Sequence, residues 1–404
     1  MANYTKQMTK DVEIYKESKC YNGYTLFAPT FSNTTAWLID MEGNICHFWE
    51  MKNPPGMNYY LLANGNLMWI GRGPGAVQQL NSAASELVEV DWDGNEVWRY
   101  DDNMINHDFC VQKNGNILLL RFEPLPKEIQ KKLKGGVPGT EINGEITYGM
   151  QVREINKDKE TLWEWNNWDH FNLDKDLECP FCDREIWGYT NSVDVFPNGD
   201  PIICVRRMNK VIRISKKTGK IIWEWGQGHH LGHPHDVSVL PNGNITIFDN
   251  GLHRRIENPG VDPNDISCYT VSRALEVNPE TNEIVWQYID PMHQVNSIFM
   301  GSVQKLPNNN YLVCNSASGT FYEISQNKEI VWKYISPFVI KIKQGFDWIS
   351  SKYIFQAHRY SHGFEGLKNK DLDPKRYEWV IQEKSEETKE EEENILSRLS
   401  KAGY

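Results

Sequence analysis

The sequence lacks any apolar run that approaches the ~20 residues a bilayer-spanning helix requires. Its first residues, MANYTKQMTKDVEIYKESK, are polar and lack the apolar core of an export signal. Positive charge is in the minority, because 43 Lys and Arg face 54 Asp and Glu, which gives a net charge of −11. This balance disfavours nucleic acid and an anionic membrane as partners. We therefore expect a cytoplasmic protein with no membrane and no nucleic-acid partner.

Cysteine usage agrees with that expectation. Most of the eight cysteines lie inside apolar, strand-like runs, as Cys204 and Cys314 do. Buried free thiols are the ordinary interpretation of cysteines in such runs.

What the sequence does contain is a repeat. Six tryptophans recur in one setting, a turn followed by a polar residue, two or three mostly apolar residues, the Trp and another polar residue. They are Trp49, Trp98, Trp163, Trp223, Trp286 and Trp332. The spacing of roughly 45 to 65 residues suits a small antiparallel sheet, which buries its faces only by stacking on its neighbours. Six copies predict an all-β, six-bladed β-propeller.

A second repeated signal is a tight turn of Asn-Gly, or a close variant, between two apolar strands. These turns lie at residues 64–65, 114–115, 198–199, 242–243 and 308–309. They require positive φ, which Gly and Asn adopt most readily. The first repeat lacks such a turn. We therefore expect the segment Lys352–Arg359 to complete that blade and remove its exposed edge.

These signals predict one propeller domain over residues 1–377, followed by a charged, helical tail at 378–404. The blades are expected at roughly 20–53, 54–102, 103–168, 187–227, 228–292 and 293–336, with 350–360 closing the ring. Two stretches interrupt the repeat, 123–147 with a short helix and 166–188. Insertions on a ring usually project from one face, and that face is often the binding face.

Equivalent positions of the innermost strands should meet near the axis of the ring. Counting seven residues back from each turn Asn gives Met57, His107, Asn191, His235 and Gly301. Two imidazoles and an amide are thus expected in one small volume. Alternatively, the His-Asp pairs at 107–108 and 235–236 only cap turns.

Two arginines follow the turn of the fourth repeat, and one of them is expected beside the same volume. Arg206 and Arg207 end the second strand of a hairpin, whose end lies beside the start of the first strand near Asn191. Strand alternation should send the other arginine away, and a surface ion pair is the plainer role for Arg207. A cavity with imidazoles and a guanidinium suits an oxyanion such as sulfate, phosphate or carboxylate.

Two patterns raise the question of a metal. The run 229–235 holds four histidines, but Pro234 disturbs regular strand geometry there, and no carboxylate or Cys cluster shares the phase. Cys179 and Cys182 have the spacing of half a zinc site. No second CxxC or histidine pair is visible in the sequence, which favours incidental spacing. We predict no metal and no cofactor.

One block of the sequence resembles a known family. The segment HPHDVSVLPNGNITIFDNG, followed by SRALEV at Ser272–Val277, is similar to the arylsulfotransferases. The order of WEWNNWDHF, TNSVDVFPNG and CVRRMNKVIRI agrees, and the resemblance covers most of residues 90–367. It implies a six-bladed propeller that moves a sulfuryl group between phenols, independently of the nucleotide sulfate donor. The implied route passes through a sulfated histidine.

The resemblance also implies roles for single residues. His235 takes the place of the nucleophile, His107 that of the histidine that assists the sulfuryl oxygens and the phenol, and Arg207 that of the sulfuryl-binding arginine. Tyr189 stands where the family carries a histidine, and a tyrosine is not readily a cation at neutral pH. Exported members of the family contrast with the cytoplasmic location expected of this chain.

We therefore predict an arylsulfotransferase-like enzyme for small phenols or aryl sulfates, with His235, His107 and Arg207 as catalytic residues. The expected substrate contacts are Tyr189, Asn191, Arg206, His170 and Tyr59. One alternative is another transferase, a hydrolase or a lyase that reuses the histidine pair on an aromatic substrate, for which Tyr189 is the motive. The other is a non-catalytic binding propeller. The physiological donor and acceptor, and homo-oligomer formation, stay open.

Overall fold

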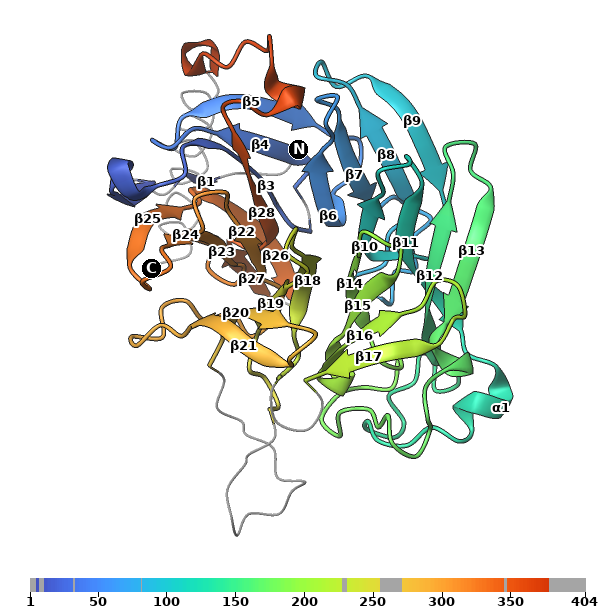
Figure 1. Cartoon of the computed structure of the whole chain (residues 1–404). Coiled ribbons are helices and arrows are strands. Elements are labelled where there is room, and N and C mark those ends of the chain that lie inside the picture. The colour runs from blue at the N-terminus through green and yellow to red at the C-terminus, as the bar shows by residue number, and fades with distance from the viewer. Residues whose placement is uncertain are drawn as a thin grey trace, which may run out of the picture.

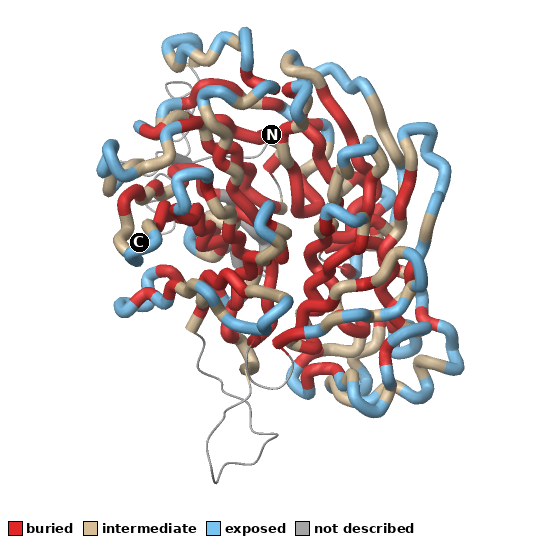
Figure 2. Tube along the Cα trace, in the orientation of Figure 1, coloured by how far each residue is buried: buried red, intermediate tan, exposed pale blue. Residues whose placement is uncertain are grey.

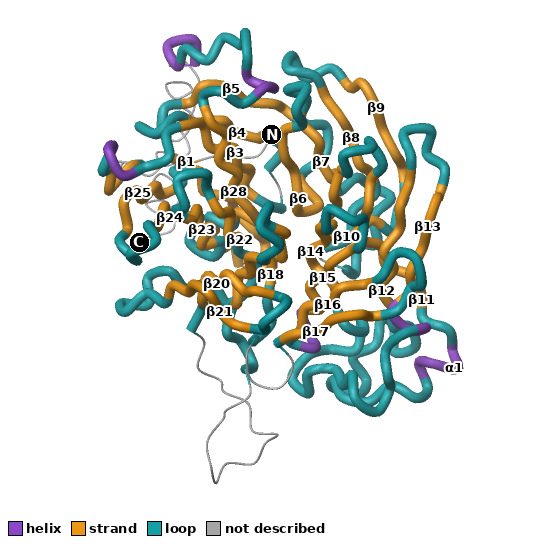
Figure 3. Tube along the Cα trace, in the orientation of Figure 1, coloured by secondary structure: helices purple, strands orange, loops and turns teal. Residues whose placement is uncertain are grey.

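The computed structural model describes residues 5–6, 11–31, 33–80, 82–226, 231–254, 271–344 and 347–377. Within these ranges the chain is all-β, and six sheets surround a central axis as the blades of a propeller (Figure 1). Helices are confined to short turns, of which α1 (Lys127–Gln130) is one (Figure 3). The predicted fold class is confirmed. The charged tail at 378–404 lies outside the described residues.

Each blade is an antiparallel sheet, and its strands follow one another from the axis outward. The first blade consists of β28 (Ile354–Ser361), β3 (Gly23–Pro29), β4 (Thr35–Ile39) and β5 (Ile45–Glu50). The second consists of β6 (Pro55–Leu61), β7 (Leu67–Gly71), β8 (Glu86–Val90) and β9 (Glu96–Asp101). The third consists of β10 (Ile105–Val111), β11 (Ile117–Pro124), β12 (Tyr148–Ile155) and β13 (Thr161–Asn166). The fourth blade consists of β14 (Thr190–Val195), β15 (Pro201–Val205), β16 (Lys210–Ile214) and β17 (Ile221–Trp225). The fifth consists of β18 (His235–Val239), β19 (Ile245–Asp249), β20 (Arg273–Asn278) and β21 (Glu283–Tyr288). The sixth contains β22 (Ser302–Lys305), β23 (Tyr311–Asn315), β24 (Thr320–Ile324) and β25 (Ile330–Ile335).

The two ends of the chain close the ring. As predicted, β28 from the C-terminal side pairs with β3 and supplies the inner strand of the first blade. At the other edge, β2 (Val12–Tyr15) adds a fifth, outer strand to the sixth blade by pairing with β25. Every inner strand then contacts the inner strands of both neighbouring blades. A small separate sheet of β1 (Thr5–Lys6), β26 (Phe338–Gln344) and β27 (Asp347–Ser351) precedes the closing strand.

Burial explains why strands at different distances from the axis have different sequences. The middle strands β7, β15, β19 and β23 are buried at every residue, since each blade packs between two neighbours (Figure 2). They accordingly read as continuous apolar runs. The outer strands β17 and β21 begin with alternating exposed and half-buried residues, and only their last residue is buried. The Asn-Gly turns adopt the expected positive φ, as Gly65, Gly115, Gly199 and Gly243 do.

The tryptophans of the repeat join each blade to the next one. An indole Nε1 on the outer strand donates to a backbone carbonyl in the last turn of the following blade, all the way round the ring. The six bonds run from Trp49 to Asp91 (3.1 Å), Trp98 to Lys157 (2.8 Å), Trp165 to Gly219 (2.8 Å), Trp225 to Asn282 (3.2 Å), Trp286 to Gln326 (3.1 Å) and Trp332 to Met41 (2.8 Å). In the third and fourth blades this bond comes from the second tryptophan of WEW rather than the first.

Five of the six inner strands have a break in their hydrogen-bond ladders. The register shifts between Asn106 and Phe109 in β10 and between His235 and Ser238 in β18, and comparable shifts occur in β6, β14 and β28. Such bulges redirect side chains out of the sheet. A carboxylate beside two of them binds the next blade's backbone. Asp108 accepts from the Val193 N–H at 2.8 Å and Asp236 from the Val303 N–H at 2.7 Å.

No helix in the described part of the chain is both long enough and apolar enough to cross a bilayer.

We expect the indole bond at the point of closure to be the costliest to remove. Trp332→Phe leaves the Met41 carbonyl without its donor at a fully buried site, and should lower the free energy of unfolding by about 2–4 kcal/mol. Trp98→Phe removes the same kind of bond at a half-exposed site and should cost about 1 kcal/mol or less. Urea denaturation measures both, and equal losses would contradict a role for burial.

The carboxyl of Asp236 should make stability depend on pH. Burial, with contributions from the Asp108 and Asp194 carboxyl groups, raises its pKa from 3.8 to about 8. Between these values the folded chain holds a proton that the unfolded chain has lost, so stability falls as the pH rises from about 4 to about 8.

The matched variant is Asp236→Asn. In the wild type the Asp236 carboxyl accepts from the Val303 N–H and from the Gln356 side chain, the latter at 3.0 Å. The amide of the variant keeps the first bond through its oxygen, and it donates to Gln356 once that side chain has turned over. Denaturation of both proteins across this pH window should show a steeper decline for the wild type, by up to ~1.4 kcal/mol per pH unit. Parallel slopes would mean that Asp236 titrates normally.

Candidate active site

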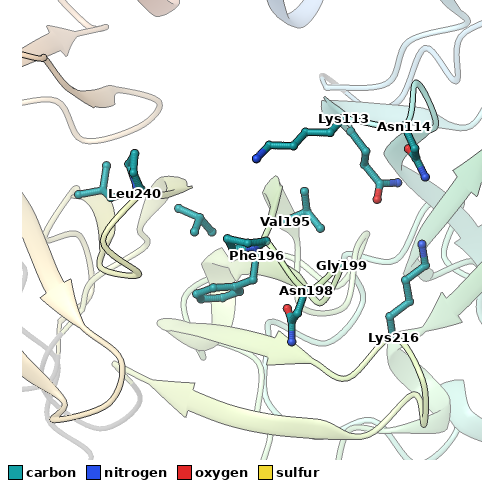
Figure 4. A pocket seen from close by; sticks show the side chains of 12 residues that line it. Lys113, Asn114, Val195, Phe196, Asn198, Gly199, Lys216 and Leu240 are labelled. Carbon is teal, nitrogen blue, oxygen red and sulfur yellow. The ribbon is translucent and has the colours of Figure 1, made fainter.

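Two cavities lie at opposite ends of the inner strands. The cavity at the Asn-Gly turns of the third to fifth blades has a volume of about 650 Å³ (Figure 4). Lys113 and Lys216 line it, but none of its twelve lining residues is a His, Cys, Asp or Glu. The second cavity, of about 420 Å³, lies where these strands begin and is rich in titratable groups. Acid–base or nucleophilic chemistry therefore fits the second cavity.

His107 and His235 both line this second cavity, although they lie 128 positions apart in the sequence. Their ring centroids lie 5.9 Å and 6.5 Å from that of Phe355, which comes from the closing strand. His107 has a φ of 46°, since it sits in the bulge of β10. Both side chains are buried, at 3% exposure. The inner strands thus place two imidazoles from the third and fifth blades at one spot.

An asparagine fixes the tautomer of each imidazole. Asn250 donates through Nδ2 to the carbonyls of Ser297 and Met300, both at 2.7 Å, so its Oδ1 is the acceptor for His235 Nδ1 at 2.7 Å. Asn106 donates in the same way to the Thr190 carbonyl and accepts from His107 Nδ1. Both rings therefore carry their proton on Nδ1 and leave the Nε2 lone pair available.

The cavity also keeps both imidazoles neutral. The pKa of His235 is lowered to about 3, mainly by burial and to a smaller extent by the nearby charge of Arg206. Burial likewise holds the pKa of His107 well below 6.5, with smaller effects from His235 and Arg206. Two neutral imidazoles that present an Nε2 lone pair, which in His235 accepts a long bond of 3.3 Å from the Met300 N–H, can act as a nucleophile and a base.

The two arginines differ in how far they are engaged. Arg207 is 5% exposed, and its guanidinium donates to Asp183 Oδ2 at 2.8 Å and to the Ile186 carbonyl at 3.0 Å. It also faces the buried Glu178 carboxylate at 3.7 Å. The guanidinium of the half-buried Arg206 lines the cavity and makes no ion pair or hydrogen bond within the described ranges. Arg206 is thus the cation available to an anionic ligand.

The expectation that strand alternation separates the two arginines was wrong. Strand β15 ends at Val205, and residues Arg206–Met208 form a 3-10 turn in which alternation does not apply. Both side chains therefore reach the cavity wall.

Tyr189 lies between the arginines and His107. Its ring meets the His107 ring edge to face at 5.1 Å, and the guanidinium carbons of Arg206 and Arg207 lie 5.3 Å and 4.7 Å from its centroid. Its hydroxyl donates to Ser82 at 3.2 Å. Asn191 is fully buried beneath this layer, where its amide donates to the Pro234 carbonyl at 2.9 Å. Tyr189 lines the cavity, whereas Asn191 does not.

Two predicted substrate contacts lie elsewhere. His170 is exposed on the outer part of the third blade, where it stacks on Trp165 with centroids 4.9 Å apart. Tyr59 is fully buried between blades, and its hydroxyl binds the Ala28 N–H and the Gln356 carbonyl, both at 2.7 Å. Neither residue is among those that line the cavity.

The sequence reasoning missed the groups that support the histidines. Asn250 lies within the FDNG block and Asn106 directly precedes His107, so local sequence offered a signal for both. Nothing local pointed to Phe355 or to Asp183, which come from the closing strand and the second insertion.

The patterns that raised the question of a metal also meet at this cavity. Cys182, His233 and His253 line its wall, and Cys179 lies behind them. A histidine pair therefore does accompany the CxxC segment, contrary to what the sequence alone indicated. His229 and His230 lie outside the described residues.

Comparison with known proteins agrees with this architecture. The family model described as arylsulfotransferase (ASST) matches residues 57–337. No curated protein matches the chain. The fold is similar to that of a Bacteroides caccae protein of unknown function, with 13% identity and a TM-score of 0.52 over 83% of this chain and 98% of that one.

Two further solved structures are similar at lower TM-scores. A streptogramin B lyase shares 11% identity over 89% of this chain and 98% of its own, with a TM-score of 0.47. A virginiamycin B lyase from Staphylococcus aureus with quinupristin shares 12% identity over 88% and 97%, with a TM-score of 0.44.

The two arginines should respond differently to the same substitution. Arg207→Met leaves the Asp183 carboxylate without its cation and opens a buried site, and should lower the free energy of unfolding by about 3 kcal/mol. Arg206→Met breaks no ion pair and should stay within about 0.5 kcal/mol of the wild type. Inorganic sulfate should raise the thermal midpoint of the wild type but not of Arg206→Met. The opposite pattern would make Arg207 the anion-binding residue.

Proposed function

Because the chain belongs to the arylsulfotransferase family, we propose that it transfers a sulfuryl group between phenolic compounds, without a nucleotide sulfate donor. In this proposal the group passes through a covalent intermediate on His235. The observation that carries the proposal is the pair of neutral imidazoles, each with a fixed tautomer, in one cavity beside Arg206.

His235 is the proposed nucleophile. Its Nδ1–H is held by Asn250, so Nε2 presents the lone pair that attacks the sulfur. The Met300 N–H donates to this Nε2 at 3.3 Å, a long bond that an incoming sulfuryl group would displace. The new N–S bond forms as the bond from sulfur to the aryl oxygen breaks, and that electron pair leaves on the phenolate.

His107 handles the proton in both halves of the reaction. The acceptor phenol gives its proton to His107 Nε2, and its oxygen attacks the sulfur while the N–S electron pair returns to His235. Because burial holds the pKa of His107 well below 6.5, its imidazolium then passes this proton, through solvent, to the phenolate released in the first half, and the neutral ring is restored. Donor and acceptor thus exchange one sulfuryl group, and the proton gained in one half is returned in the other.

Arg206 is the proposed anchor for the sulfuryl oxygens. It lines the same cavity as His107 and His235 and makes no competing ion pair in the described structure, which supports this role. A guanidinium that already faces the cavity stabilises charge on the peripheral oxygens without prior reorganisation. This assignment replaces Arg207, whose guanidinium is held by Asp183.

The remaining wall supports a small aromatic substrate. Phe299 and Phe31 both contact Tyr353, with ring centroids 5.0 Å and 6.0 Å apart, and Met57 and Met300 lie in the same lining. Aromatic and thioether groups are suited to pack on a phenol ring.

The free thiols support a cytoplasmic location in this proposal. The seven cysteines in the described part of the chain form no disulfide, as is usual in a reducing compartment.

Incubation with 4-nitrophenyl sulfate and a phenol acceptor tests the proposal. We expect acceptor-dependent release of 4-nitrophenol, and a gain of one SO₃ group on the His235 peptide when the donor is supplied alone. His235→Asn should lower kcat/KM by roughly 10⁴-fold or more, and His107→Gln by roughly 10²–10⁴-fold.

His170→Asn is the matched control, because this exposed histidine lies outside the cavity, and it should retain wild-type rates. Release without an acceptor would indicate a hydrolase. A sulfuryl adduct on another residue, or no turnover of any aryl sulfate, would contradict the proposed route.

A further inference from the structure

Four side chains with metal-binding atoms converge beside the proposed active site. The sulfurs of Cys179 and Cys182 and one ring nitrogen each of His233 and His253 all lie within 4.8 Å of one another. Cys179 Sγ lies 3.2 Å from His253 Nδ1, and Cys182 Sγ lies 3.7 Å from His233 Nε2. The two imidazoles meet edge to face with centroids 4.8 Å apart.

These residues come from three separate loops. The cysteines lie in the insertion between β13 and β14, His233 lies just before β18, and His253 follows β19. Three of the four side chains are buried and the fourth is half-buried. His233 is fully enclosed, and its Nδ1 has no hydrogen-bond partner among the described residues. The polar contact of this ring is therefore made through Nε2, on the side of the cluster.

The backbone holds this arrangement through Asn209, which ends the 3-10 turn of the two arginines in a left-handed conformation (φ 53°). Its side chain accepts from the His233 N–H at 2.8 Å and donates to the His253 carbonyl at 3.3 Å. In the same turn, the Arg207 carbonyl accepts from the Cys179 N–H at 3.1 Å. One turn therefore positions the backbones of three of the four residues.

A close approach of two glycines brings the histidine loops together. A Cβ at Gly232 would lie 2.6 Å from the carbonyl carbon of Gly251, so only glycine allows this contact. Gly232 and Gly251 each lie one or two residues from a histidine of the cluster. The close packing of these two loops keeps the rings of His233 and His253 in contact with each other.

We propose that Cys179, Cys182, His233 and His253 form a binding site for one Zn²⁺ ion. Two sulfurs and two imidazole nitrogens are a ligand set typical of structural zinc, with Zn–S near ~2.3 Å and Zn–N near ~2.0 Å. Tetrahedral angles then place a sulfur and a nitrogen about 3.5 Å apart, a value that lies between the two observed separations. Soft thiolates with imidazoles favour zinc over magnesium or calcium.

Loading requires both thiols to lose their protons to solvent, while the imidazoles bind in their neutral form. Two thiolates balance the charge of the ion, so the loaded site is neutral. Arg206 then keeps its positive charge for an anion in the cavity. Four protein ligands leave no open coordination position, so the ion supports the site and does not activate substrate.

The ion would fix the wall of the active-site cavity. Cys182, His233 and His253 line that wall, and Asp183, next to Cys182, holds Arg207 in place. His233 lies two residues before His235 on the same segment. Zinc would therefore connect the second insertion to the strand that carries the proposed nucleophile.

Metal analysis of the full chain, purified with a reductant and without chelator, tests the site directly. We expect about one zinc per chain. After replacement by Co²⁺, the spectrum should show thiolate-to-cobalt charge transfer and the intense visible bands of tetrahedral cobalt. X-ray absorption should give a first shell of two sulfurs and two nitrogens. Chelation should lower the thermal midpoint, and added zinc should restore it.

Substitutions separate this site from incidental proximity. Cys182→Ser and His253→Ala should each lose most of the bound zinc. In the cobalt-substituted protein, each should also weaken the thiolate-to-cobalt charge-transfer band. Cys110→Ser is the matched control, because this cysteine is not part of the cluster and its sulfur contacts Asp194 instead. The variant should retain zinc fully. If a ligand variant fails to fold, competition of the wild type with a chelating dye still reports stoichiometry and affinity.

Two outcomes would overturn the proposal. One is a zinc content that Cys182→Ser and His253→Ala leave unchanged, and the other is a Cys179–Cys182 disulfide in protein isolated without exposure to oxidants. None of these measurements depends on sulfuryl transfer. A chain that binds zinc but does not turn over aryl sulfates therefore refutes only the proposed function.

Discussion

A donor–acceptor bond between the indole of one blade and the last turn of the next holds this ring together. It recurs six times, and the sixth copy, from Trp332 to Met41, joins the last blade to the first. The tryptophan is large enough to fill the wedge between two sheets and carries one N–H to satisfy a turn carbonyl there. Closure then leaves no end blade with an uncovered sheet face, because every blade has a neighbour on both sides. The buried ion pair of Arg359 and Glu323, at 3.3 Å, reinforces the same junction.

Ring closure also determines where chemistry can occur. Because the inner strands contact one another around the axis, a bulge at one height in several blades directs side chains to one place. His107 and His235 occupy such bulges, while the neighbouring Asp108 and Asp236 bind the backbone of adjacent blades. The residue that faces the cavity and the residue that binds the next blade are thus neighbours in sequence.

The loops on this side of the ring add what the repeat does not contain. The second insertion supplies Asp183, which engages Arg207, so that only Arg206 faces the cavity unpaired among the described residues. The same insertion brings Cys179 and Cys182 to two histidines from the fifth blade. One short turn, residues 206–209, connects these features through its backbone and the side chain of Asn209. The same turn therefore carries the two arginines of the cavity wall and positions residues of the proposed zinc site.

Periodic features were readable from the sequence alone. The tryptophan and Asn-Gly repeats indicated the number of blades, the closing role of residues 352–359 and the shared position of His107 and His235, since a repeat carries its phase along the chain. The pairing of Arg207, the displacement of His170 and Tyr59 from the cavity, and the meeting of Cys179 and Cys182 with His233 and His253 depended on the tertiary structure. Loops have no period, and their contacts are set by close packing and hydrogen bonds between segments that lie far apart in the chain.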